Sequence, residues 1–141
     1  MQENFTGFVL AGGKSSRMGR DKAFLEFDGE TFLRKSFNAL APNCEKICVV
    51  LNKSQTHFIE KIPENCEYIF DIYENRGALG GIHCALQNCE TKFAVILAVD
   101  LPFMTSDAVK NLCEISENSN NFSAVVPRQI DGRLQPTCAV Y

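Results

Sequence analysis

The sequence predicts an α/β fold: a Rossmann-like, mostly parallel sheet with helices on both faces and an antiparallel addition near the C-terminus. Short apolar runs alternate along the chain with segments whose apolar residues have helical spacing. The run FAVILAV at residues 93–99 is apolar at every position, as in a central parallel strand covered on both faces. Near the end, Asp131-Gly132 separates two apolar stretches, a pattern typical of a hairpin.

The first half of the chain should hold three strands and two helices. The strands are expected at residues 6–11, 47–51 and 68–70, the first ending at Gly12-Gly13. The helices are expected at residues 31–40 and 55–62, which are followed by Pro42 and Pro63. Between them, the short apolar piece 23–27 closes in a turn at Asp28-Gly29.

The second half continues the alternation. A helix is expected over 78–88, followed by the strand 93–99. Ser106 is a suitable N-cap for a helix that runs to about Ile115, and residues 114–121 should form a polar loop. The expected hairpin then consists of strands 122–126 and 134–141.

Composition limits the function classes. The chain has 141 residues, enough for one domain, and its net charge of -3 disfavours general nucleic-acid binding. It has no apolar run long enough to span a membrane and no basic, signal-like N-terminus, so a cytoplasmic protein with no membrane partner is expected. The seven cysteines contain no C-x-x-C pair, which favours buried thiols in a reducing compartment over a metal site.

The loop after the first expected strand carries the strongest sign of chemistry. Residues 10–22 combine glycines, which allow the backbone to approach a ligand, with the cations Lys14, Arg17, Arg20 and Lys22. This composition favours phosphate binding, although the spacing fits neither the P-loop nor the dinucleotide fingerprint. The alternative is a solvated basic loop.

Two further strand ends carry carboxylates. Asp100 directly follows a buried strand, a position that suits Mg²⁺ shared with substrate phosphates, or simply begins a turn with Pro102. Asp71 ends another strand and precedes the glycine-rich residues 77–81, which either open a helix toward an anion or ribose or form a tight loop. His57 and His83 are expected to be structural.

Residues 10–19 with Asp21-Lys22 resemble the signature L-A-G-G-x-S-x-R-M-G-x-D-K of the nucleotidyltransferase family that contains molybdenum cofactor guanylyltransferase. Several later segments match that family in order: Asn52, Asp71, residues 77–81, Asp100-Leu101-Pro102, Gln135-Pro136 and residues 139–141. Residues 76–80 lack the family's prolines. Members usually continue further, with an N-x-N-T-like motif, so residues 1–141 are expected to be a single nucleotidyltransferase domain without the family's C-terminal portion.

The resemblance implies transfer of GMP from GTP to the phosphate of molybdopterin cofactor, with release of pyrophosphate. Lys22, Arg17 and Asp100 would be catalytic, and Asp100 would hold Mg²⁺. Lys14 and Arg17 would bind the β- and γ-phosphates, and Lys22 would neutralise charge at the α-phosphate. The implied nucleotide-binding residues are Leu10, Ala11, Gly12, Gly13, Lys14, Lys22, Asn52, Asp71 and Asp100.

Three alternatives share the same loop. A cytidylyltransferase for the same cofactor, or a sugar-phosphate nucleotidyltransferase, would differ in base or acceptor. A non-catalytic nucleotide-binding module would bind nucleotide without releasing pyrophosphate. The partners implied by the first reading are GTP, molybdopterin cofactor and molybdoenzyme maturation proteins, with no nucleic acid.

Overall fold

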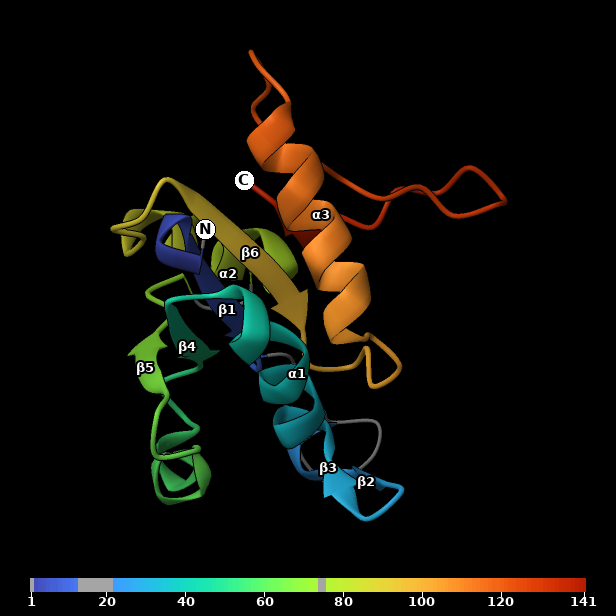
Figure 1. The fold of residues 1–141 in the computed structure, drawn as a ribbon. Coiled ribbons are helices and arrows are strands. Elements are labelled where there is room, and N and C mark those ends of the chain that lie inside the picture. Colours follow the sequence, from blue (N-terminus) through green and yellow to red (C-terminus); the bar gives the residue numbers. More distant parts are fainter. Residues whose placement is uncertain (1, 13–21, 74–75) are drawn as a thin grey trace.

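The computed structural model describes residues 2–12, 22–73 and 76–141. Its centre is a five-stranded sheet with the strand order β5-β4-β1-β6-β7 (Figure 1). Four strands run parallel: β1 (Phe5–Leu10), β4 (Lys46–Leu51), β5 (Glu67–Phe70) and β6 (Phe93–Ala98). At one edge, β7 (Cys138–Val140) pairs antiparallel with β6. The predicted fold class is therefore confirmed.

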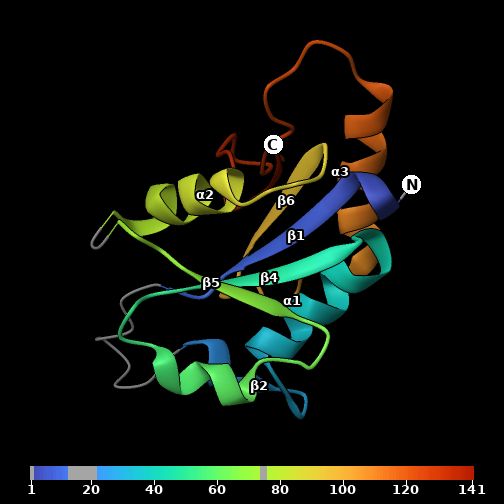
Figure 2. The same cartoon turned by 90° about the vertical axis from the view of Figure 1, so that its left-hand side faces the viewer.

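Helices cover both faces of this sheet (Figure 2). On one face lie α1 (Phe32–Leu40) and α3 (Ser106–Asn118), and on the other lies α2 (Gly77–Gln87). Alternate residues of each central strand belong to different cores: Val95 packs in the core that includes α1 and α3, and Ile96 in the core that includes α2. This double burial explains why the central strands are apolar at every position.

The remaining elements are short. A hairpin of β2 (Glu26–Phe27) and β3 (Glu30–Thr31) turns at Asp28 and Gly29, both with positive φ. The 3₁₀ segments are η1 (Gln2–Asn4), η2 (Lys22–Phe24), η3 (Ala41–Asn43) and η4 (Thr56–Lys61). The helix predicted at residues 55–62 is thus a 3₁₀ helix, a form typical of short pieces like this one, which ends just before Pro63.

The limits predicted for α3 were wrong at both ends. Its N-cap is Thr105 and not Ser106, because the Thr105 hydroxyl accepts the Ala108 N–H at 3.2 Å. The helix continues beyond Ile115 to Asn118, so most of the predicted polar loop 114–121 is helical. The polar residues there form the exposed side of the helix, whereas Ser116 faces the core and donates to the Leu112 carbonyl.

The C-terminal hairpin is present, but its predicted strands are largely wrong. Residues 122–126 hold only an isolated bridge, from Val125 to Val140, and residues 134–141 form a strand only at Cys138–Val140. Pro127 and Pro136 have no N–H to donate, which prevents a continuous ladder. The predicted turn is confirmed: Gly132 has φ +90° and donates to the Gln129 carbonyl at 2.9 Å.

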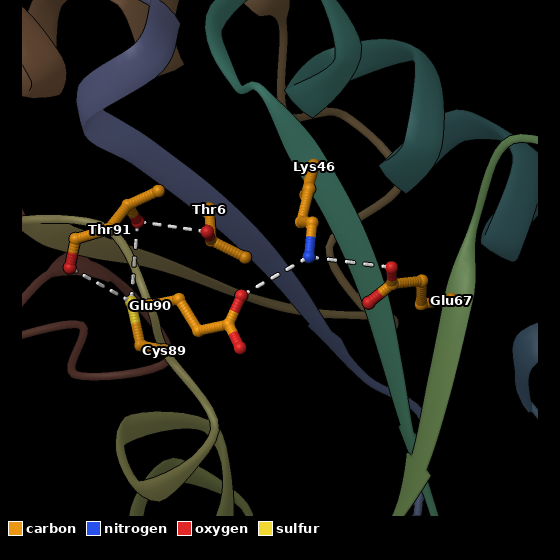
Figure 3. A network of polar contacts seen from close by, with 6 residues as sticks. All are labelled: Thr6, Lys46, Glu67, Cys89, Glu90 and Thr91. Atoms are coloured by element: carbon orange, nitrogen blue, oxygen red, sulfur yellow. Dashed lines mark hydrogen bonds and ion pairs between the residues drawn. The ribbon is translucent and has the colours of Figure 1, made fainter.

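A polar network ties the strands together at their amino ends (Figure 3). Lys46 Nζ lies 3.5 Å from Glu67 Oε1 and 3.4 Å from Glu90 Oε2, and these two carboxylates raise the pKa of Lys46. The hydroxyl oxygens of Thr6 and Thr91 are 2.8 Å apart. The network therefore lies at the edge of the sheet opposite the carboxyl ends of the parallel strands, which is where ligands bind in open α/β sheets.

Across the described residues, no helix is both long and apolar enough to cross a lipid bilayer.

Candidate functional site

A cavity of about 220 Å³ lies at the carboxyl ends of the parallel strands. Its walls come from the ends of β1 and β6, from the segment before β7, and from the first turns of α2. The predicted nucleotide-binding residues that line it are Leu10, Ala11, Gly12, Lys22, Asp71 and Asp100, and the glycine-rich segment 77–81 contributes Gly77, Ala78 and Gly81. The topology therefore brings together segments from most of the described chain at one edge of the sheet.

The backbone of Ala11 and Gly12, directly after β1, lies close to β4 and Asn52. The Ala11 N–H donates to the Val50 carbonyl at 3.0 Å, which extends the pairing of β1 with β4 by one residue. At Gly12, a Cβ would lie 2.9 Å from Asn52 Oδ1 and 3.2 Å from Asn52 N. A side chain at position 12 would therefore require the Asn52 side chain to move and its backbone to shift slightly, whereas glycine lets the backbone lie close against Asn52.

Lys22 and Asp100 form an ion pair at the cavity. Lys22 Nζ is 3.6 Å from Asp100 Oδ2, and the two side chains are 43% and 49% exposed. Lys22 begins η2 and Asp100 lies two residues after the end of β6, so the fold joins two segments that are far apart in the sequence. A cation and a carboxylate thus stand together, accessible to a charged ligand.

Asp71 is the most enclosed acidic residue of the site, with 8% of its surface exposed. Its backbone N–H donates to the Leu51 carbonyl at 2.7 Å, and its Oδ1 accepts the Tyr73 N–H at 2.8 Å. A Cβ on Gly80 would lie 3.1 Å from Asp71 Oδ2. Gly80 therefore lets α2 approach this carboxylate closely, which is one of the two arrangements that the glycine-rich residues 77–81 suggested.

Asn52 does not line the cavity, but it is held beside it. Its N–H donates to Gln55 Oε1 at 2.7 Å, and Gln55 Nε2 donates to the Ala11 carbonyl at 3.0 Å. The sequence analysis missed this role of Gln55, because no motif marks it. It also missed Thr137, which lines the cavity and whose carbonyl accepts the Ala98 N–H at 2.8 Å. The position of Thr137 directly after Gln135-Pro136 was the available signal.

Three predicted site residues, Gly13, Lys14 and Arg17, lie outside the described residues. Among the residues that the structure does describe, no group of three or more His, Cys, Asp or Glu side chains could hold a metal ion. A cation at Asp100 would therefore need further ligands beyond the His, Cys, Asp and Glu side chains of the described residues. Mg²⁺ commonly binds in this manner, with one or two carboxylates, water and substrate phosphates.

A model of the MobA-like NTP transferase domain family matches residues 7–141. The chain belongs to this family. A probable molybdenum cofactor guanylyltransferase of Clostridium perfringens strain 13 is 37% identical over 135 residues, covering 94% of this chain and 63% of that relative. The molybdenum cofactor guanylyltransferase of Desulfosudis oleivorans is 32% identical, with coverages of 96% and 64%.

A solved structure supports the same fold. The molybdopterin-guanine dinucleotide biosynthesis protein A from Archaeoglobus fulgidus superposes with a TM-score of 0.77 at 24% identity, over 96% of this chain and 66% of that one. The chain spans 63% of the length of the first Clostridium relative and a similar share of the others described here. The family match therefore applies to the part of those relatives that residues 7–141 correspond to.

Proposed function

We propose that this domain transfers GMP from GTP to the phosphate of molybdopterin cofactor and releases pyrophosphate. The observation that carries the proposal is the Lys22–Asp100 ion pair, which stands at a cavity on the ligand-binding edge of the sheet. The names of the relatives supply the substrates, because guanylyltransferases of the molybdenum cofactor match almost the whole of this chain.

The proposed chemistry depends on charge and position. The acceptor phosphate is already an anion, so the reaction needs no general base. Lys22 would stabilise the negative charge that develops at the α-phosphate, and loss of such a group typically lowers the rate by about 10²–10³. Asp100 would hold Mg²⁺, which supplies charge neutralisation to the triphosphate.

The proposed nucleotide contacts follow the cavity wall. The base and ribose would contact the backbone of Leu10, Ala11 and Gly12 and the side chain of Asp71, all of which line the cavity. Asn52 would act from beside Gly12. Gly13, Lys14 and Arg17 complete the proposed set through their match to the family signature, with Lys14 and Arg17 on the phosphates that leave.

Two parts of the proposal concern the setting. A reducing, cytoplasmic location is consistent with the seven cysteines, all of which are free. Exchange of the product with molybdoenzyme maturation proteins follows from the reaction, since the product is a cofactor that must reach another protein.

Nucleotide binding is tested by thermal shift with GTP, CTP, ATP and UTP, each with and without Mg²⁺. A ligand present at 100 times its Kd stabilises the fold by about 2.7 kcal/mol, which raises the melting temperature by several degrees. We expect a shift with GTP and Mg²⁺ that is lost in Lys22→Ala and Asp100→Ala. Lys110→Ala is the matched control, because it removes another exposed lysine from an ion pair with Glu114.

The transfer step is tested by pyrophosphate release with GTP and molybdopterin cofactor together. Release that requires both substrates supports the proposal. A thermal shift with CTP alone would instead favour the cytidylyltransferase. Binding of GTP without any release of pyrophosphate would favour the non-catalytic nucleotide-binding module.

A further inference from the structure

Gln55 is a buried polar side chain that touches two different loops at the edge of the cavity. Only 4% of its surface is exposed. Its Nε2 donates to the Ala11 carbonyl at 3.0 Å, and its Oε1 accepts the Asn52 N–H at 2.7 Å. One amide group therefore satisfies a carbonyl after β1 and an N–H after β4.

The backbone of Gln55 adds a third link. Its N–H donates to the Asn52 carbonyl at 3.0 Å, so Gln55 and Asn52 are joined through both main chain and side chain. The 3₁₀ segment η4 then begins without a side-chain cap from Gln55, whose amide makes these other contacts. The geometry thus fixes the short turn 52–55 and attaches it to the end of β1.

This attachment acts on two segments that lie close together at the site. Ala11 and Gly12 line the cavity, and a Cβ on Gly12 would meet Asn52 Oδ1 at 2.9 Å. Gly12 therefore lies close to Asn52, and the hydrogen bonds of Gln55 to Ala11 and Asn52 maintain this short separation. A shift of either loop would change the shape of the cavity wall.

We propose that Gln55 is a positioning residue for nucleotide binding, which holds the Ala11–Gly12 backbone and Asn52 at the separation that the nucleotide requires. The inference rests on the proposed function of the same cavity. A glutamine suits this role because its side chain both donates and accepts, and one partner of each kind is present. No other buried amide side chain among residues 2–12, 22–73 and 76–141 joins two strand ends in this manner.

The test compares nucleotide affinity with fold stability. If Gln55 served only to stabilise the fold, its loss would affect the free and the nucleotide-bound chain equally and leave the Kd unchanged. If it positions the loops, its loss weakens binding, because the nucleotide must then order them. Gln55→Met keeps a side chain of similar length without hydrogen bonds, and we expect it to raise the Kd of GTP with Mg²⁺ at least about tenfold.

Two further variants sharpen the comparison. Thr6→Val is the matched control, because it likewise removes the hydrogen bond of a buried polar side chain. That hydrogen bond joins Thr6 to Thr91 at the amino ends of the strands, away from the cavity (Figure 3). This variant should lower the melting temperature without changing the Kd. Gln55→Glu keeps the acceptor for Asn52 and regains a donor only when protonated. Its affinity relative to the wild type should therefore improve as the pH falls from 8 to about 5.5.

The outcomes separate this inference from the proposed function. Folded Gln55→Met and Gln55→Glu variants that bind GTP as tightly as the wild type would overturn the positioning role and leave the function intact. A wild-type chain that binds no nucleotide would overturn the function and the inference together. Weaker binding in the Gln55 variants, with unchanged binding in Thr6→Val, supports the inference.

Discussion

Gly12 is a position where an added methyl group would press against Asn52. Replacing it with alanine would place Cβ 2.9 Å from Asn52 Oδ1, so either the Asn52 side chain must move or the two segments must separate. We expect Gly12→Ala to destabilise the fold by about 1–3 kcal/mol and to weaken GTP binding. Chemical denaturation and titration with GTP measure the two effects.

A double variant separates the causes. Asn52→Ala removes the oxygen that the new methyl group would meet, although the backbone nitrogen of residue 52 stays 3.2 Å away. Part of the lost stability should therefore return in Gly12→Ala with Asn52→Ala. Strictly additive losses in the double variant would contradict the steric explanation.

Asp100 offers a test of charge without loss of the fold. Its ion pair with Lys22 joins two side chains that are about half exposed, and such pairs contribute little to stability. Asp100→Asn should therefore melt within a few degrees of the wild type. The additional thermal shift that Mg²⁺ gives in the presence of GTP should be lost, because the amide carries no charge. An unchanged Mg²⁺ effect would mean that Asp100 is not the metal ligand.

At the scale of the elements, α3 depends on a cap that the sequence pattern assigned to the neighbouring residue. The Thr105 hydroxyl accepts the Ala108 N–H, and the Thr105 backbone is extended, as in an N-cap. Thr105→Ala should cost about 1 kcal/mol of folding free energy, measured by urea denaturation. Ser106→Ala should cost clearly less, and Thr105→Ser should restore most of the stability. Equal losses at the two positions would contradict this assignment.

The central strands and helices were predictable because the pattern of their apolar residues shows which positions are buried. Strands such as β6 are covered on both faces and show an unbroken apolar run, and α1 shows a regular apolar stripe. The predicted lengths of the two C-terminal hairpin strands were too great, because apolar content does not reveal whether a strand has a hydrogen-bonding partner. Pro127 interrupts one side, and only residues 138–140 find a partner strand in β6.

The site was predictable where its residues follow strands. Asp100 and Asp71 each come directly after an apolar run, and parallel strands place such ends at one edge. Gln55 could not be found this way. Its partners are a backbone carbonyl and a backbone N–H, which any sequence supplies, and the carbonyl of Ala11 follows a strand that is remote from Gln55 in the chain.

At the scale of the whole molecule, the thiols report how well the core excludes water. Burial raises the pKa of Cys48, Cys66 and Cys113 from 9.0 to about 12 and that of Cys138 to about 11. An unfolded chain loses these protons near pH 9, whereas the folded chain keeps them. The stability that the thiols contribute is therefore fully present below pH 9 and decreases as the pH rises toward 11 to 12.

We expect the free energy of unfolding, measured by urea denaturation between pH 7 and pH 10.5, to fall above pH 9. Cys48→Ala with Cys138→Ala should show a shallower decrease, since two of the titrating groups are absent. Alkylation by iodoacetamide at pH 7.5 should be slow in the native chain and fast in urea. Rapid native alkylation of Cys48 or Cys138 would contradict their burial.

The position of β1 between β4 and β6 has a consequence for synthesis on the ribosome. Ala11 and Lys22 emerge from the ribosome before β4 and β5, but β6 and Asp100 emerge after them. A nascent chain that ends before residue 93 can complete at most the strand order β5-β4-β1, because the partner of the other side of β1 and the cavity wall at the end of β6 are still missing. GTP thus has no completed site to stabilise until residue 100 has been synthesised, and the sheet must close by its own packing before the nucleotide can contribute.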